Sequence, residues 1–242
     1  MKAYIIKLVL EDSKPLIWRR VVMPAGATFN RLHDVIQGVT NFSGDGHLYA
    51  FYLHEEGIVV TNDEEAYEEY TYLKKNKKEI LEQLKARVPE NQYLVQLAEI
   101  HERLKTIVRK PSGLKIDEYL ERHGTVDYRY DYGDGWQFTV TLEEIVKDYY
   151  FGYPTLLDGK VTAPPEDVGG LDGFKQFLAI YKDPDHPEHE ETVAWATSQN
   201  FQQYDKEKIN SLLKFIQYQK TEWDKIDHQN YVIVEDKYRE ND

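Results

Sequence analysis

The sequence predicts an α+β fold, in which a mixed or antiparallel sheet packs against helices and carries an inserted, charged helical hairpin. Alternating apolar residues near the N-terminus and an aromatic strand pair over residues 128–142 predict the sheet. From about residue 62 to residue 112 the spacing is helical, with little strand signal, which predicts the insertion. We therefore expect one α+β domain over residues 1–226 and a charged tail over residues 227–242.

The first two strands are predicted at residues 4–10 and 16–22, because turn-forming residues separate two alternating segments. In the second strand, the period of two places Trp18 and Arg20 on one face and Arg19 on the other. One arginine is thus expected on each side of the sheet.

The remaining elements follow from spacing and from capping residues. Thr28 is the expected N-cap of a helix that ends near Gly38 or Asn41, and a strand follows at residues 47–53. The insertion is predicted to form two helices interrupted at Pro89. Further helices are expected at residues 116–123, around 174–181, at 188–197 and at 206–223, with a strand at residues 231–234 in the tail.

The aromatic hairpin allows its register to be argued. A two-residue turn would mix aromatic and polar faces, whereas a three-residue loop over residues 133–135 pairs Tyr130 with Phe138 on one aromatic face. We predict the three-residue loop, with the aromatic face in the core. On that register, Arg129 and Asp131 share the opposite face.

Residues 164–170 combine two prolines, two glycines and neighbouring carboxylates before a predicted helix. A glycine-rich turn entering a helix suits a phosphate, but Glu166 and Asp167 would repel an anion, so a cation is the better ligand. Downstream, the spacing of His186 and His189 permits a metal site and equally fits a capping turn.

Composition restricts the classes of function. The chain of 242 residues holds 30 basic and 43 acidic residues, and its formal charge of −13 disfavours broad binding to nucleic acid or anionic lipid. The absence of cysteine excludes disulfides and thiolate chemistry. No apolar run approaches the roughly 20 residues that a membrane span needs, so we expect a soluble, cytoplasmic protein.

No nucleophile elbow, phosphate loop, zinc-helix motif or dinucleotide fingerprint is present. Candidate site residues are therefore the polar and aromatic side chains near the predicted turns. The candidate pocket comprises Trp18, Arg20, His47, Tyr49, Arg129, Asp131, Asp134, Trp136, Glu166 and Asp167. The metal-ligand candidates are His47, Asp131, Glu166, Asp167, His186 and His189.

Six ordered segments carry a family resemblance: residues 14–20, 32–37, 47–51, 130–136, 164–170 and 186–189. Together they resemble the plasmid pRi open-reading-frame-three-like family, whose members include "TnpR-like" passenger proteins of mobile elements. The resemblance implies an α+β fold and an association with plasmids or transposons. It implies no catalytic mechanism, and this chain has no serine-recombinase motif.

Three functions remain open. The first is a noncatalytic binding or accessory module with an unknown protein or small ligand as its partner and no cofactor. The second is a hydrolase or nuclease dependent on a divalent metal, which requires the His, Asp and Glu candidates to converge. The third is DNA binding through Trp18, Arg19, Arg20, Lys74, Lys75, Lys77, Lys78, Arg109 and Lys110.

Overall fold

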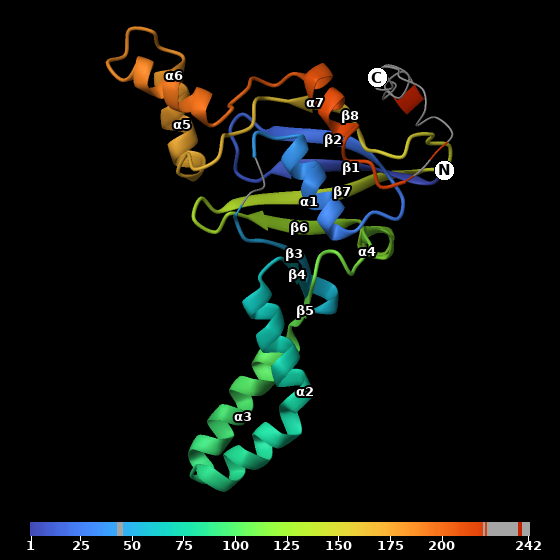
Figure 1. Cartoon of the computed structure of the whole chain (residues 1–242), viewed down its shortest axis with the longest axis vertical. Helices are drawn as coiled ribbons and strands as arrows, with labels where there is room; N and C mark the ends of the chain where they lie inside the picture. The colour runs from blue at the N-terminus through green and yellow to red at the C-terminus, as the bar shows by residue number, and fades with distance from the viewer. Residues whose placement is uncertain (43–45, 220, 222–236, 239–242) are drawn as a thin grey trace.

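The computed structural model describes residues 1–42, 46–219, 221 and 237–238. One eight-stranded sheet organises this part of the chain, in the order β5-β4-β3-β6-β7-β1-β2-β8. All neighbouring strands are antiparallel except β4 and β5, which are parallel. Helix α1 lies across the middle of the sheet, α5 to α7 gather at one end, and α2 and α3 project from the other (Figure 1). The α+β prediction is confirmed.

The element bounds are as follows. The strands are β1 (Ala3–Leu10), β2 (Ile17–Pro24), β3 (Tyr49–Leu53), β4 (Ile58–Thr61), β5 (Ile107–Arg109), β6 (Thr125–Tyr130), β7 (Trp136–Val146) and β8 (Thr155–Lys160). The helices are α1 (Phe29–Gly38), η1 (His54–Glu56), α2 (Glu64–Arg87), α3 (Glu90–Lys105), α4 (Ile116–His123), α5 (Gly170–Tyr181), α6 (His189–Ser198) and α7 (Lys206–Leu213).

The core forms between α1 and one face of the sheet. Thr28 caps α1 by accepting a hydrogen bond from the Arg31 backbone N–H, as its sequence predicts. The apolar face of α1 then packs on inward side chains of the strands, including Tyr128, Tyr130 and Trp136, all essentially buried. The predicted alternation in β2 also holds, since Arg19 is buried on this inner face.

The predicted register of the β6–β7 hairpin is wrong by two residues. Tyr130 pairs with Trp136 and Tyr128 with Phe138, so the connection spans five residues, 131–135, instead of three. The reason is local: Asp131 leaves the strand with φ of 50°, and its carbonyl accepts a hydrogen bond from Gly135 N at 2.6 Å. Because the shift is even, the aromatic face still lies in the core.

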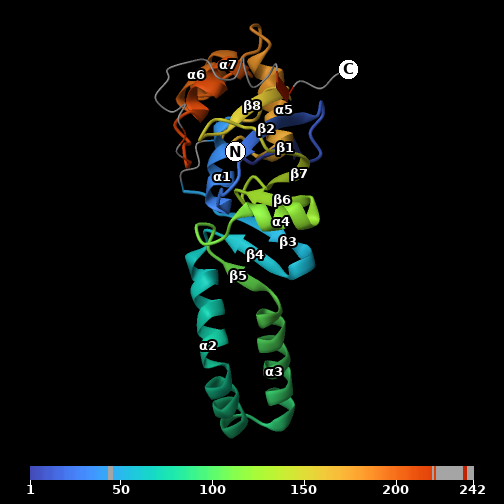
Figure 2. The ribbon, with the colours of Figure 1, turned by 90° about the vertical axis from the view of Figure 1, so that its right-hand side faces the viewer.

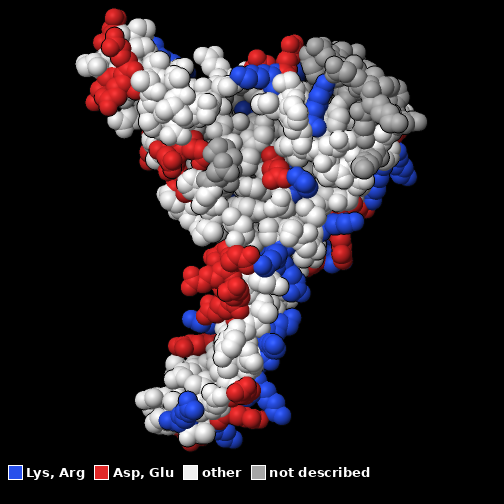
Figure 3. Space-filling model, viewed as in Figure 1, with Lys and Arg blue, Asp and Glu red and all other residues white. Residues whose placement is uncertain are grey.

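The insertion forms the predicted helical hairpin, and its return segment adds the short strand β5 beside β4. Helices α2 and α3 run side by side away from the sheet (Figures 1 and 2). In the part of this projection nearest the sheet, acidic residues gather on one side and basic residues on the other (Figure 3). Most of its side chains are exposed, and only Tyr70 and Ile100 of these two helices are buried.

The last predicted helix is too long. Helix α7 ends at Leu213, and beyond it the Tyr218 and Gln219 backbone N–H groups both donate to the Gly152 carbonyl at 3.1 Å. These tertiary hydrogen bonds replace the helical ones that the spacing predicted. The strand predicted at residues 231–234 lies outside the described residues. None of the described helices combines the length and the apolar character that a bilayer span requires.

Candidate metal centre

Three connections meet at the edge of the core beside the β6–β7 hairpin. The Asp131 backbone N–H donates to the Leu48 carbonyl at 3.0 Å, which holds the segment before β3 against the hairpin loop. Asn41 forms an isolated bridge with Pro165, which places the segment between β8 and α5 beside the end of α1. Backbone contacts therefore fix the position of all three connections.

Two of the candidate carboxylates belong to residues whose backbone is left-handed. Asp131 has φ of 50° and Asp167 has φ of 53°, a region that residues with a Cβ seldom adopt and that aspartate tolerates better than most. The Asp131 turn is closed by its own side chain, whose Oδ1 accepts a hydrogen bond from Gly133 N at 2.9 Å. Strained backbone of this kind is typical of ligand-binding positions.

His47, Asp131 and Glu166 converge on one point. Each offers a donor atom, and the three atoms lie within 4.8 Å of one another. His47 Nδ1 is 3.4 Å from Asp131 Oδ1, and His47 Nε2 is 3.5 Å from Glu166 Oε2. In the part of the chain that the structure describes, this is the one histidine and carboxylate cluster with metal-ligand spacing.

A fourth group lies at the outer side of the cluster. Asp167 Oδ1 is 3.8 Å from His47 Nε2, and its side chain is 64% exposed. By contrast, Asp131 and Glu166 are only 6% and 5% exposed. The cluster therefore has a buried pair of carboxylates, an imidazole between them, and one carboxylate facing solvent.

Tyr130, on the aromatic face of the hairpin, contacts two residues of the cluster. The Tyr130 hydroxyl donates to Glu166 Oε1 at 2.7 Å, and the His47 ring meets the Tyr130 ring edge-on at 5.7 Å. The sequence places Tyr130 in the core but gives no sign of this second role. A buried tyrosine in a strand usually needs a partner for its hydroxyl, and that requirement is the only signal that could have pointed to Glu166.

Beside the cluster, α1 carries a buried histidine, His33. His33 stacks on Tyr49 with ring centroids 3.8 Å apart, and its Nδ1 lies 2.7 Å from the Tyr128 hydroxyl. Gln37 donates to the same hydroxyl at 3.1 Å, which leaves the hydroxyl proton for His33. Burial lowers the pKa of His33 to about 4, so this imidazole is neutral near pH 7.

Two further candidate residues, Asp134 and Trp136, lie near the cluster and make contacts within the fold. Asp134 accepts a hydrogen bond from Gly169 N at 3.2 Å, which ties the hairpin loop to the start of α5. Gly170 approaches so closely that a Cβ there would lie 2.8 Å from the Asp134 carbonyl oxygen. Trp136 is buried in the core, and its Nε1–H has no hydrogen-bond partner among the described residues.

The other candidates lie elsewhere. On β2, Trp18 stacks with Lys7 and Arg20 pairs with Glu143 at 2.6 Å. Arg129 lies on the outer face of the hairpin against Tyr52, so the prediction that it shares a face with Asp131 is wrong: the left-handed turn carries Asp131 inward.

His186 lies in the turn before α6, and His189 is the first residue of that helix. His186 Nδ1 accepts from the Glu188 backbone N–H at 3.1 Å, and His189 Nδ1 lies 3.1 Å from the Ile180 carbonyl. Neither residue belongs to the cluster of His47, Asp131 and Glu166.

The chain is similar to known proteins in sequence and in fold. The model of the family described as plasmid pRiA4b ORF-3-like protein matches residues 2–212. An uncharacterised protein of Sinorhizobium fredii (strain NBRC 101917 / NGR234), y4hQ, is 28% identical over 196 residues, which cover 81% of each chain. The crystal structure of a protein of unknown function from Methanosarcina mazei Go1, MM3350, is similar with a TM-score of 0.58 and 28% identity, covering 86% of this chain and 97% of that one.

Proposed function

The chain belongs to the plasmid pRiA4b ORF-3-like family, and for this member we propose that it binds a divalent metal ion through His47, Asp131 and Glu166. The observation that carries the proposal is the convergence of these three donor atoms within 4.8 Å from three separate connections. Residues 84 and 35 positions apart in the sequence meet there only because the fold brings them together.

Charge supports a cation at this point. Two buried carboxylates and the exposed Asp167 face a single imidazole, which can carry at most one positive charge. Burying like charges beside each other is unfavourable unless a cation neutralises them. A divalent ion at this point would balance the two buried carboxylates.

Donor chemistry and spacing narrow the choice of metal. One imidazole with two carboxylates suits zinc or manganese better than calcium, which takes six to eight oxygen ligands. Ligand atoms around a tetrahedral zinc lie about 3.4 Å apart, because each bond is about 2.1 Å long. The distance of 3.5 Å from His47 Nε2 to Glu166 Oε2 fits this spacing, and Asp131 Oδ1 lies 3.4 Å from the other ring nitrogen, Nδ1.

The two ring nitrogens of His47 face different carboxylates, so one nitrogen can bind the ion while the other donates to a carboxylate. Metal-bound histidines commonly donate their other N–H to a carboxylate that orients the ring. An ion at Nε2 would have Glu166 and Asp167 on its side, and Asp131 would hold Nδ1–H. In this arrangement His47 and Glu166 hold the ion and Asp131 orients the ring, so all three residues of the cluster contribute.

Calorimetric titration tests the proposal. Protein treated with a chelator and dialysed should bind one equivalent of Zn²⁺ or Mn²⁺. Glu166→Gln keeps the size of the side chain and removes its charge, so affinity should fall by about 1000-fold, more than the 10- to 100-fold typical of groups that only orient a ligand.

Glu190→Gln is the matched control, because Glu190 is exposed on α6 and belongs to no such cluster. It should bind metal like the unmodified protein. Equal affinity in all three proteins, or no binding by the unmodified protein, would contradict the proposal.

Metal-dependent hydrolysis is the second candidate, and the position of Asp167 favours it. Three protein ligands leave a coordination position free, and the His47 side chain is 27% exposed, so the cluster is reachable from solvent. Asp167 at its outer side could accept a proton from an attacking water.

A screen of ester and phosphodiester substrates with added Zn²⁺ or Mn²⁺ tests this. If hydrolysis occurs, Asp167→Asn should lower kcat more than it lowers metal affinity. Metal binding without turnover of any substrate would instead favour a noncatalytic binding module.

A further inference from the structure

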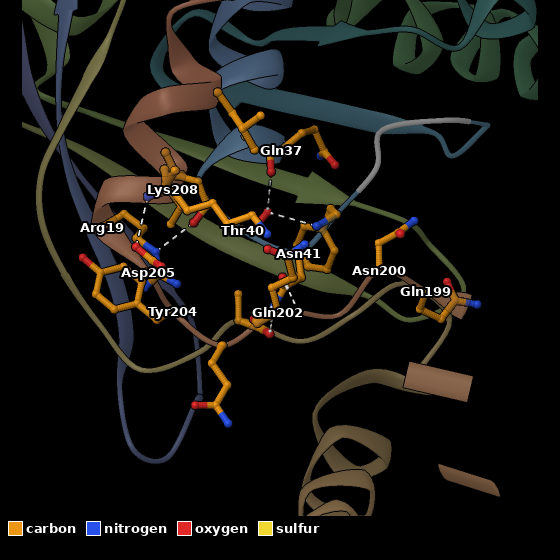
Figure 4. Close-up of a pocket in the computed structure, with 17 residues that line it drawn as sticks. Arg19, Gln37, Thr40, Asn41, Gln199, Asn200, Gln202, Tyr204, Asp205 and Lys208 are labelled. Carbon is orange, nitrogen blue, oxygen red and sulfur yellow. Dashed lines mark hydrogen bonds between the residues drawn. The ribbon is translucent and has the colours of Figure 1, made fainter. Parts of the chain in front are cut away.

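A cavity lined in part by Ala163 lies between the end of α1, strand β2 and the segment that leads into α7 (Figure 4). Its volume is about 270 Å³, the size of a small metabolite. The polar side chains of the lining include Arg19, Thr40, Tyr204 and Lys208, beside apolar ones such as Phe42 and Leu212.

Arg19 is the unusual member of this lining. It is only 3% exposed, and its Nε–H donates to the Val39 carbonyl at 2.8 Å. Its Nη1 donates to the carbonyls of Trp18 at 2.8 Å and Lys160 at 3.1 Å. The guanidinium also lies over the Tyr204 ring, 4.4 Å from its centroid.

These contacts leave the charge of Arg19 unbalanced. Within the described part of the chain, no carboxylate lies within ion-pair distance of the guanidinium, and Nη2 has no hydrogen-bond acceptor. Burial lowers the pKa of Arg19 to about 10, which still leaves it protonated near pH 7. Carbonyls and an aromatic ring hold the cation in place without neutralising it.

The rest of the site is built around this cation. A Cβ at Gly159 would lie 2.8 Å from Arg19 Cδ and 2.9 Å from the Tyr204 hydroxyl, so glycine there makes room for both groups. Lys208 adds a second, exposed cation to the lining. The one carboxylate of the lining, Asp205, caps α7 by accepting from Lys208 N at 3.0 Å.

We propose that this cavity binds a small anion, a carboxylate or a phosphate group, whose charge pairs with Arg19 and is supported by Lys208. The N–H groups of Arg19 Nη2 remain to donate to an anion, and the oxygens of both a carboxylate and a phosphate form strong charge-assisted hydrogen bonds with a guanidinium. The site is separate from the metal cluster, and the proposal stands independently of metal binding.

Nuclear magnetic resonance titration of the chelator-treated protein tests the proposal. Inorganic phosphate and acetate are added separately at constant ionic strength, and the Arg19 Nε–Hε signal and the backbone signals of Thr40 and Tyr204 are followed. Saturable shifts of these signals are expected with at least one of the anions, and the anion that binds more tightly identifies the chemical group.

Reversing the charge of Lys208, at the rim of the cavity, can be compared with the same change at Lys175, outside it. Lys208→Glu changes an exposed residue, so folding should persist, and affinity for the anion should fall about tenfold because an attractive charge becomes repulsive. Lys175→Glu makes the same change of net charge on exposed α5, outside the cavity, and should leave affinity unchanged.

Two outcomes would overturn the proposal. One is the absence of saturable shifts at Arg19 with both anions. The other is an equal loss of affinity in Lys208→Glu and Lys175→Glu, which would show that only net charge attracts the anion. A purely structural role of Arg19 at the end of α1 predicts the first of these outcomes.

Discussion

Two regions of the molecule use charge in opposite ways. In the cluster beside the β6–β7 hairpin, two carboxylates that are at least 94% buried share one imidazole, and the Tyr130 ring lies edge-on to that imidazole. In the projecting hairpin of α2 and α3, charged side chains pair on the surface; Arg103 with Glu69 joins the two helices while both side chains remain more than half exposed.

The charged side chains of the hairpin remain hydrated on the surface, whereas burial of the two carboxylates in the cluster costs free energy. Exposed ion pairs contribute little to stability, because water already stabilises both partners. Buried carboxylates lose that hydration and are retained where they bind or orient a ligand. The contrast therefore supports the proposed metal site at His47, Asp131 and Glu166, although the hairpin of α2 and α3 has more charged residues in its sequence.

The largest predicted effect is stabilisation by metal. At a free Zn²⁺ concentration of 1000 times Kd, the free energy of unfolding should rise by about 4 kcal/mol, because the ion binds only the folded chain. Hydrogen exchange should slow in the connections around residues 46–49, 130–135 and 163–170, and not in α2 and α3. Mass spectrometry of exchanged peptides measures both regions at once.

The same measurement on Glu166→Gln provides the control, since that variant should show neither change. Equal slowing in the hairpin helices would mean that the ion binds the exposed carboxylates there, and would remove the distinction between the cluster and the hairpin.

A smaller effect should follow from pH. The pKa of His33 in the folded chain is about 4, below its ordinary value of 6.5. Between pH 6.5 and pH 4 the unfolded chain therefore binds more protons, and the free energy of unfolding falls as pH is lowered through this window. The full loss, reached below pH 4, is on the order of 3 kcal/mol.

Chemical denaturation at a series of pH values measures this loss. His33→Phe should remove this part of the slope, and His101→Gln, on exposed α3, should keep it. A slope in His33→Phe equal to that of the unmodified chain would show that other groups cause the acid sensitivity.

How well the sequence predicts the molecule depends on the range of the interactions involved. Local patterns were sufficient for α1, which has its cap at Thr28, and for the placement of Arg19 on the inner face of β2. The β6–β7 register was predicted wrongly, because the left-handed turn at Asp131 depends on contacts with Leu48 and Gly135 that spacing does not encode.

A third prediction concerns the link between the aromatic face and the cluster. Tyr130→Phe removes the hydroxyl that donates to Glu166 Oε1 and keeps the ring in the core. Affinity for Zn²⁺ should fall about tenfold, the low end of the range for groups that orient a metal ligand. Tyr72→Phe, on exposed α2, should leave affinity unchanged in the same calorimetric titration.

The smallest effect is expected in the hairpin. Arg103→Met breaks the ion pair with Glu69 and should change the free energy of unfolding by about 0.5 kcal/mol or less. Urea denaturation measures the change. A loss several times larger would show that the pair holds the two helices together and that exposure is a poor guide to the role of charge in this chain.

The candidate site was predicted in part. His47, Asp131, Glu166 and Asp167 were named for their residue types, and the fold brings these four together. Trp18, Arg20 and Arg129 were grouped with them and lie elsewhere, because only the strand order decides which turns share an edge. The hydroxyl of Tyr130 could not be assigned, since its partner is 36 residues away.

The most direct test of the metal centre is anomalous diffraction from crystals grown with Zn²⁺, recorded on both sides of the zinc absorption edge. The account predicts one strong anomalous peak within about 2.1 Å of a His47 nitrogen and of the Glu166 carboxylate. A peak at the exposed acidic residues of α2, with none beside His47, would contradict it.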